Sequence, residues 1–204
     1  MIITVSREFG SGGRELGKRL ADALNIPCYD HQIIEMIANE HGFNEEYVAT
    51  VSERSIEAAY PMTIGHHFGM LPIGVMEQPI RVAATQRRII ENFAAQGDCV
   101  IVGRCADVIL REQQPLNLFI YADMASKVRR CMERAAEGEN VSAQEIERQI
   151  KRIDKGRIQY RRMYDDGKWG DKENYHLCIN TSNREIRDLV PALAQFCKDW
   201  FAGK

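Results

Sequence analysis

The sequence predicts an α/β fold in which a parallel β-sheet is covered by helices on both faces. Short apolar runs, typical of buried strands, alternate along the chain with longer segments of helical periodicity. In addition, glycine-rich or charged residues directly follow three of the expected strands, at the end of a parallel sheet where ligands bind. With 204 residues the chain suits one compact domain, and we expect a single domain over residues 1–204.

The expected elements follow from these patterns. Strands are predicted at 2–6, 25–30, 98–104, 116–122 and 175–182, of which 25–30 could be a short second strand. Helices are predicted at 11–24, 31–42, 44–60, 80–97, 123–136, 142–164 and 183–201. The helix at 142 starts with a capping box, because Ser142 and Glu145 can each satisfy an orphan backbone N–H.

Residues 61–79 are rich in Pro, Gly and Met and are expected to form a long loop. Loops of this length in compact domains are usually functional or mobile. Its apolar residues are expected to pack against the body of the protein or a second subunit, so that a homodimer is possible. His66 and His67 are adjacent and have no Cys or carboxylate cluster close in sequence, so we expect no metal site there.

Composition limits the partners of the protein. The formal net charge of −2 provides no overall attraction to nucleic acid or to anionic lipid. No apolar run approaches the roughly 18–20 residues that span a bilayer, and the start of the chain does not resemble a signal peptide. The cysteines are scattered singly and are expected to be reduced, buried thiols. We therefore expect a cytoplasmic protein without nucleic-acid or membrane partners.

A glycine-rich segment, FGSGGRE, connects the first expected strand to the first expected helix. Gly10, Gly12 and Gly13 allow the backbone to approach a ligand closely, and Ser11 adds a hydroxyl group. Successive backbone N–H groups and the N-terminus of a helix can together hold one anion. The segment therefore has the physical features of a phosphate-binding loop.

This segment departs from the usual pattern G-x-x-x-x-G-K-[ST]. If Gly12 is the second glycine of the pattern, Arg7 occupies the place of the first glycine and Gly13 that of the lysine. Arg7 and Arg14 place guanidinium groups on either side of the loop, and a guanidinium can hold phosphate oxygens with two hydrogen bonds. We expect Arg14 to replace the missing lysine. The alternative is a glycine-rich turn with exposed arginines.

Charged residues also mark the ends of two other strands and one late helix. Asp30 and Arg104 each follow an expected strand. Asp30 could orient a bound substrate or a metal-bound water. It could instead cap the next helix. Arg157 and Arg161 lie four residues apart on a basic helix, with Asp154 one turn earlier. This helix could close over a polyphosphate or present a solvated basic face; RNA binding is disfavoured by the near-neutral net charge and the lack of interleaved aromatic residues.

Taken together, these segments resemble the cytidylate kinase family, in particular its cytidylate kinase-like branch, over nearly the whole chain. The matching fragments, in order, are SREFGSGGRE, CYD (Asp30), IRVAATQRR (Arg81, Gln86, Arg87), VGRC (Gly103, Arg104), RIDKGRIQYRR (Asp154, Arg157, Arg161) and YHLCINTS. The resemblance implies a P-loop NTPase-type parallel sheet of the nucleoside monophosphate kinase type with a helical lid. It also implies an acceptor-binding helical region at about 31–97 and a lid at about 138–171.

The resemblance implies a transfer of the γ-phosphate of ATP, with Mg²⁺, to CMP or a related small phosphorylated acceptor. The donor is then expected on Arg7, Gly10, Ser11, Gly12, Gly13, Arg14 and Glu15. Asp30, Arg81 and Arg104 are expected to contact the acceptor. Arg14, Asp154, Arg157 and Arg161 are expected to serve catalysis, with Arg157 and Arg161 as clamps on the transferred phosphoryl group.

Three positions depart from the family pattern. Gly13 replaces the loop lysine, Glu15 replaces a threonine that helps to hold magnesium, and Cys105 replaces the acid that reads the cytosine amino group. These departures leave two alternatives open: a nucleotide-binding regulatory protein with a degenerate loop, and a kinase for a substrate that is not a nucleotide.

Overall fold

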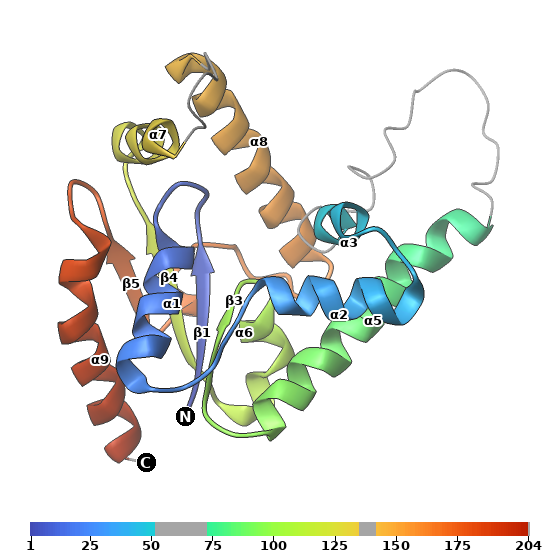
Figure 1. Ribbon diagram of the computed structural model, residues 1–204, viewed down its shortest axis with the longest axis horizontal. Helices are drawn as coiled ribbons and strands as arrows, with labels where there is room; N and C mark the ends of the chain where they lie inside the picture. Colours follow the sequence, from blue (N-terminus) through green and yellow to red (C-terminus); the bar gives the residue numbers. More distant parts are fainter. Residues whose placement is uncertain (52–72, 135–141, 204) are drawn as a thin grey trace.

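The computed structural model describes residues 1–51, 73–134 and 142–203. Its centre is a parallel sheet in the order β2-β3-β1-β4-β5, which confirms the predicted α/β architecture (Figure 1). The strands are β1 (Ile2–Arg7), β2 (Cys28–Tyr29), β3 (Cys99–Val102), β4 (Leu116–Tyr121) and β5 (Leu177–Asn180). All neighbouring strands pair in parallel; Ile2 of β1, for example, lies opposite Cys99 of β3.

Helices account for most of the remaining described residues. The helices on the two faces of the sheet are α1 (Gly13–Leu24), α2 (His31–His41), α3 (Glu45–Val51), α5 (Ile73–Ala95), α6 (Ala106–Ile109) and α9 (Ile186–Ala202). Two further helices, α7 (Met124–Glu133) and α8 (Ala143–Arg162), and two short 3-10 turns, η1 (Arg111–Gln113) and η2 (Lys172–Asn174), complete the fold. Within the described ranges, no helix has both the length and the apolar character needed to cross a membrane.

Alternation along the central strands separates two hydrophobic cores. Ile3 and Val5 of β1 point toward α1 and α9, with Val100 and Val102 of β3 beside them. Ile101 of β3 points to the other face, where it packs in the core formed with α2, α3, α5 and α6. Figure 1 shows α1 and α9 on one side of the sheet and α2, α5 and α6 on the other. Because both faces are covered, apolar residues dominate both sides of the central strands, as the sequence pattern indicates.

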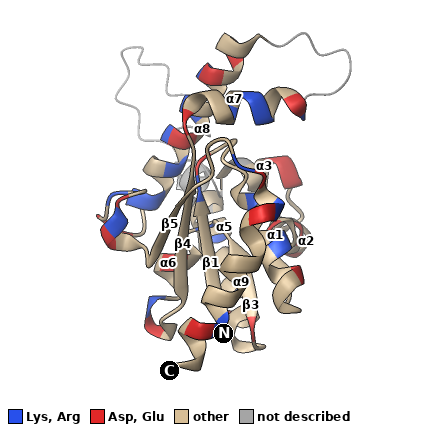
Figure 2. Ribbon diagram, turned by 90° about the vertical axis from the view of Figure 1, so that its left-hand side faces the viewer, with Lys and Arg blue, Asp and Glu red and all other residues tan. Residues whose placement is uncertain are grey.

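The carboxyl ends of the strands meet at one edge of the sheet, below α7 and α8 (Figures 1 and 2). There β1 leads into the glycine-rich loop and β3 into Gly103 and Arg104. The helix α8 begins with the predicted capping box: the N–H of Glu145 donates to Ser142 Oγ at 3.2 Å, and the N–H of Ser142 donates to Glu145 Oε2 at 2.9 Å.

The predicted loop at 61–79 was wrong in its last part, because α5 already begins at Ile73. Proline inside a helix removes one backbone hydrogen bond, so Pro79 favoured a break in the sequence pattern. In the structure Pro79 is buried and the helix continues through buried Val82 to Ile89. Packing of this apolar side compensates for the lost hydrogen bond.

Some predictions lie outside the described residues. These are the end of the helix at 44–60, the loop at 61–72 with the pair His66 and His67, and the start of the lid at 138–141. The six cysteines are free thiols; Cys99 and Cys197 are buried and the others are half-buried.

Candidate functional site

A cavity of about 540 Å³ opens at the carboxyl ends of β1 and β3, between the glycine-rich loop, α2 and the helices α7 and α8. Of the residues predicted from the sequence, it is lined by Arg7, Gly10, Gly12, Gly13, Arg14, Asp30, Arg104 and Arg157. Ser11, Glu15, Arg81, Asp154 and Arg161 are not part of this lining. Most of the candidate residues therefore converge on one space, although they are spread over 150 positions of the chain.

The glycine-rich loop has the backbone form of a phosphate cradle. Gly10 and Gly12 have φ angles of 76° and 83°, a left-handed conformation that favours glycine. Gly12 is the N-cap of α1 and has no side chain to cap it, so the first N–H groups of the helix are left for a ligand or for water. The site therefore offers backbone donors and the positive end of a helix to an anion.

Ser11 stabilises the loop through hydrogen bonds of its hydroxyl and carbonyl groups. Its buried hydroxyl donates to the carbonyl of Glu8 at 2.8 Å, and its own carbonyl accepts a hydrogen bond from Thr181 Oγ1 at 2.7 Å. Arg130 of α7 also donates to this carbonyl at 3.4 Å and to the carbonyl of Arg184 at 2.9 Å. Ser11 thus holds the shape of the loop rather than facing the cavity.

Arg14 and Glu15, on the first turn of α1, are both engaged in ion pairs. The Nε atom of Arg14 lies 2.5 Å from Asp30 Oδ2, and the Arg14 side chain is 70% exposed. Asp30 occupies the N-cap position of α2, but its side chain makes no capping hydrogen bond. Glu15 pairs with Arg19 at 2.8 Å and with Arg134 of α7 at 2.5 Å. These pairs place Arg14 and Asp30 together on the wall of the cavity.

The helix α8 is hydrogen-bonded directly to the loop. Asp154 Oδ1 accepts from the N–H of Phe9 at 2.7 Å, and Arg157 Nη1 donates to the carbonyl of Arg7 at 3.0 Å. Their side chains are only 14% and 11% exposed. Arg157 is therefore not part of a solvated basic face in this structure, because α8 packs against the loop.

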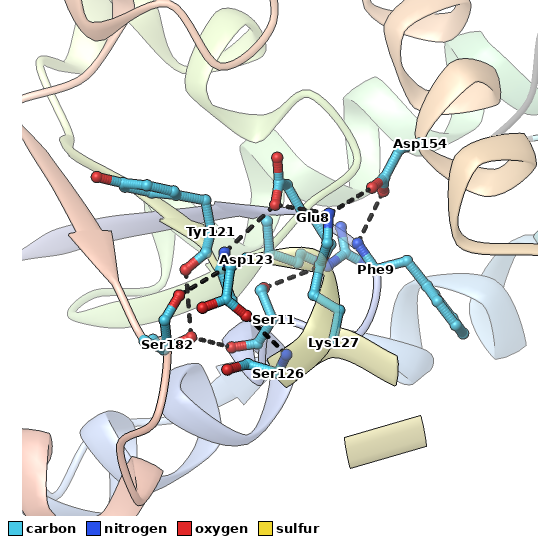
Figure 3. A network of polar contacts seen from close by, with 12 residues as sticks. Glu8, Phe9, Ser11, Tyr121, Asp123, Ser126, Lys127, Asp154 and Ser182 are labelled. Carbon is cyan, nitrogen blue, oxygen red and sulfur yellow. Dashed lines mark hydrogen bonds and ion pairs between the residues drawn. The ribbon is translucent and has the colours of Figure 1, made fainter. Parts of the chain in front are cut away.

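Burial raises the pKa of Asp154, although the hydrogen bond from Phe9 and the nearby charges of Arg157 and Lys127 oppose this shift. Lys127 of α7 reaches the same place: its Nζ atom is 2.9 Å from Glu8 Oε2 and 3.7 Å from Asp154 Oδ2 (Figure 3). A lysine, two carboxylates and a backbone N–H therefore tie α7, α8 and the loop together.

Arg161 has a different environment from Arg157. Its side chain is 4% exposed and forms a buried ion pair with Asp107, and its guanidinium lies 5.7 Å from the ring centre of Tyr175. It lines a small pocket of about 30 Å³ next to the main cavity, together with Arg7 and Arg104. Arg161 is therefore buried and does not belong to a solvated basic face, because its guanidinium pairs with the Asp107 carboxylate.

Arg104 lines the main cavity and is buried, with a φ angle of 59°. Its carbonyl accepts a hydrogen bond from Gln86 Nε2 at 3.1 Å, and the same nitrogen lies 2.8 Å from Tyr160 Oη. Helices α5 and α8 therefore hold the turn that carries Arg104. Burial, with the neighbouring Asp107 charge, raises the pKa of Cys105, so its thiol is neutral near pH 7. Arg81 is exposed on α5, outside the cavity lining.

The sequence analysis did not single out the basic residues of α7. Lys127 and Arg130 are buried beside the loop, and Arg130 and Arg134 line the cavity. The signal was available: several basic residues follow the strand that ends at Tyr121, at helical spacing. A basic helix after a strand of a parallel sheet can reach the ligand-binding edge.

The cavity lining is strongly cationic. Its arginines are Arg7, Arg14, Arg104, Arg130, Arg134 and Arg157. Its two acids are Glu8, which pairs with Lys127, and Asp30, which pairs with Arg14. Guanidinium groups are suited to phosphate oxygens, so a polyphosphate fits this lining.

The family resemblance implies Mg²⁺, an ion that needs few ligands from the protein. Among the described residues, no three His, Cys, Asp or Glu side chains gather into a metal-binding group. Mg²⁺ in such sites keeps waters and phosphate oxygens and takes only one or two carboxylates. Asp30 lines the cavity but is paired with Arg14, so the residues present fit an ion held mainly by phosphate oxygens and water.

Comparisons with known proteins identify the fold and the family of the chain. An uncharacterized protein from Eubacterium ventriosum is similar at 27% identity, with a TM-score of 0.68 over 96% of this chain and 97% of that one. Shikimate kinase from Bacteroides thetaiotaomicron shares the fold, at 14% identity and a TM-score of 0.55 over 97% of this chain and 98% of its own.

Shikimate kinase from Acinetobacter baumannii, in complex with shikimate, also shares the fold, at 16% identity and a TM-score of 0.52 over 97% and 93% of the two chains. No curated protein matches the chain significantly. The fold is thus that of P-loop kinases. The sequence profile of the cytidylate kinase-like family matches residues 2–183, and the chain belongs to that family.

Proposed function

We propose that the protein is an ATP-dependent phosphotransferase of the nucleoside monophosphate kinase type, which phosphorylates CMP or a related small phosphorylated acceptor. The observation that carries this proposal is a single cavity with a phosphate loop on one wall and the buried Arg104 on another. Such an arrangement brings two phosphate groups together between fixed positive charges. Phosphoryl transfer depends mainly on this kind of positioning and charge neutralisation.

The donor triphosphate is assigned to the glycine-rich loop. Gly10 and Gly12 supply the cradle, and the N-terminus of α1 faces the phosphates. Arg130 and Arg134 approach from α7, on the side of the loop that lies toward β5. Mg²⁺ would enter with ATP and be held mainly by phosphate oxygens and water.

The acceptor is assigned to the side of the cavity formed by the ends of β2 and β3 and by α2. Arg104 would bind its phosphate, and Asp30 would orient it. His31 and Ile34 of α2 complete this wall, within the acceptor-binding region proposed at 31–97. We assign the base and sugar of the acceptor to this side of the cavity.

The base preference depends on position 105, where Cys105 replaces the family's acidic residue. The neutral Cys105 thiol cannot accept strongly from a cytosine amino group. Asp107, two residues later, is held in its buried ion pair with Arg161. We therefore place CMP within a group of related acceptors and make base preference an outcome of the experiment below.

In the reaction, an oxygen of the acceptor phosphate attacks the γ-phosphorus of ATP, and the bond from this phosphorus to the bridging oxygen breaks. The electron pair of that bond remains on the terminal phosphate of ADP. An ionised acceptor phosphate brings no proton to remove, so no general base is needed. The chain would then have to align the two phosphates and stabilise their charge, and Arg104 and Arg157, which both line the cavity, can contribute to this.

One alternative has specific support. The lysine position is Gly13, and the loop N–H of Phe9 is already bonded to Asp154. A protein with these features could bind a nucleotide tightly and transfer phosphate slowly, as a regulatory nucleotide-binding protein would.

The deciding experiment is an ADP-release assay with Mg²⁺ and ATP, carried out with CMP, UMP, AMP and GMP in turn. A reaction without acceptor corrects for ATP hydrolysis. Faster ADP release with at least one monophosphate, and formation of the diphosphate, support the proposal. ATP binding without acceptor-dependent ADP release would favour the regulatory alternative. If shikimate, added as a fifth acceptor, gives ADP release and none of the four monophosphates does, the substrate is not a nucleotide.

A further inference from the structure

Arg7 and Gly13 reverse the usual order of residue types in a phosphate loop, because the basic residue comes first and the glycine comes second. In the phosphate-loop pattern, the place of Arg7 is the first glycine and the place of Gly13 is the lysine. The structure shows that these residues touch. A Cβ atom added to Gly13 would overlap the Cβ atom of Arg7 and lie 3.1 Å from its Cγ. The stem of Arg7 therefore lies over the backbone of Gly13, and a lysine at position 13 would have to displace it.

The guanidinium of Arg7 reaches the end of the neighbouring strand β3. A Cβ atom on Gly103 would overlap Arg7 Nη1 and lie 2.7 Å from Arg7 Cζ. Gly103 also has a φ angle of 75°, a conformation that favours glycine. The absence of a side chain at position 103 therefore leaves the place in which the guanidinium of Arg7 rests.

This place lies between the donor and acceptor walls of the site. Arg7 lines the main cavity with the loop glycines, and it lines the small adjacent pocket with Arg104. The carbonyl of Arg7 is also held by Arg157 of α8, at 3.0 Å. A charge at this position faces the region where a phosphate moves from donor to acceptor.

Arg14 is the other candidate for the role of the lysine, but its side chain pairs with Asp30 rather than lying next to Gly103. Its side chain is 70% exposed, and its Nε atom is paired with Asp30 Oδ2. It also follows the lysine position by one residue, so its stem leaves the first turn of α1 in another direction. Arg14 is therefore placed at the rim of the site.

We propose that Arg7 supplies the positive charge that the lysine supplies in an ordinary phosphate loop, and that Gly13 and Gly103 are glycines because the Arg7 side chain crosses both. This inference rests on the proposed function and deepens it, because it names the residue that contacts the transferred phosphoryl group. Loss of Arg7 should weaken the binding of the triphosphate and slow its transfer.

The test compares Arg7→Ala, Arg14→Ala and Arg88→Ala. Arg88 is a control on α5, half exposed and paired with Glu40. Calorimetric titration measures the affinity for ATP in the absence of acceptor. We expect Arg7→Ala to lower ATP affinity roughly 10- to 100-fold, as the loss of hydrogen bonds to a charged group would. Arg14→Ala should have a smaller effect, about threefold, as for an exposed ion pair.

Two further variants separate this role from simple loss of folding. Adding guanidinium ion at low concentration to Arg7→Ala should restore part of the ATP affinity or turnover, because the cation can occupy the space left above Gly103. The double variant Arg7→Gly with Gly13→Lys, which restores the usual pattern, should bind ATP more tightly than Arg7→Gly alone. Circular dichroism and a thermal unfolding curve accompany each variant.

The outcomes are distinct. Wild-type ATP affinity in a folded Arg7→Ala, or a larger loss in Arg14→Ala, overturns the inference about Arg7. If the wild-type protein binds ATP but phosphorylates no acceptor, the proposed function fails, and the affinities still decide the role of Arg7. If the wild-type protein does not bind ATP, both proposals are rejected.

Discussion

The carboxylate of Asp154, on α8, accepts a hydrogen bond of 2.7 Å from the backbone N–H of Phe9, in the glycine-rich loop. This bond joins the helix predicted to form the lid to the segment predicted to hold the donor phosphates. It involves a buried carboxylate that also lies near Lys127 and Arg157. The conformation of the loop is therefore coupled to the position of α8 through a direct hydrogen bond.

Replacing Asp154 should loosen this loop. Asp154→Ala removes the acceptor of the Phe9 N–H, whereas Asp154→Asn retains a carbonyl oxygen that can accept the bond. We expect the amide of Phe9 to exchange with solvent about 10- to 100-fold faster in the alanine variant, since hydrogen bonds to charged groups contribute roughly 1.5–3 kcal/mol. Hydrogen exchange measured by NMR checks this. Equal exchange rates in the wild-type protein and Asp154→Ala would show that the bond does not hold the loop.

Arg157→Ala should lower kcat more than it changes either KM. We expect the guanidinium of Arg157, held near the loop by the Arg7 carbonyl, to contact phosphate oxygens most strongly in the transition state. Arg162→Ala is a matched control, because Arg162 is exposed on the same helix. Steady-state kinetics on the best acceptor measures the effect. A fall in affinity for ATP with kcat unchanged would assign Arg157 to ground-state binding instead.

Ligands should also protect the helix that carries Arg157. We expect hydrogen exchange over residues 142–171 to slow when ATP and acceptor, or a bisubstrate analogue, are bound, because phosphates draw the arginines and exclude water. Mass spectrometry of the exchanged peptides follows this, with peptides from α9 as the internal control. Exchange that is indifferent to ligands would mean that α8 is only a structural support.

Arg104→Ala should raise the KM of the phosphorylated acceptor strongly while leaving ATP affinity nearly unchanged. Arg104 is buried at the end of β3, on the acceptor side of the cavity, so its loss removes the anchor for the acceptor phosphate. Arg81→Ala, an exposed position on α5, tests the weaker candidate for acceptor contact. A comparison of CMP with cytidine completes the test. If the nucleoside is used as well as the monophosphate, Arg104 does not read an acceptor phosphate.

Arg161→Ala should reduce stability first and activity only as a consequence. The variant leaves the Asp107 carboxylate buried without its partner, which should lower the free energy of unfolding by about 3–5 kcal/mol. Changing both partners, with Arg161→Met and Asp107→Leu, should cost less, because no buried charge remains unpaired. Equilibrium unfolding in urea measures both. An Arg161→Ala variant with wild-type stability but reduced kcat would return Arg161 to the role of phosphate clamp.

The sequence by itself determined the features that depend on neighbouring residues. Apolar periodicity indicated the strands and most helices, and the Ser142–Glu145 capping box was recognisable because both partners lie within one turn. The positions of Asp30 and Arg104 at strand ends could also be predicted, since the carboxyl ends of parallel strands meet at one edge. The start of α5 at Ile73 could not, because the burial of Pro79 and Val82 is a tertiary effect.

Only the tertiary structure decided how the charged residues are paired. Arg157 and Arg161 look equivalent on a helical repeat, yet Arg161 meets Asp107, 54 residues away, while Arg157 meets the carbonyl of Arg7, 150 residues away. The contact of Arg7 with Gly13 and Gly103 is likewise invisible in the sequence, because it depends on how β1 and β3 end side by side. Charges act over a few ångströms through space, and the distance along the chain carries no information about that separation.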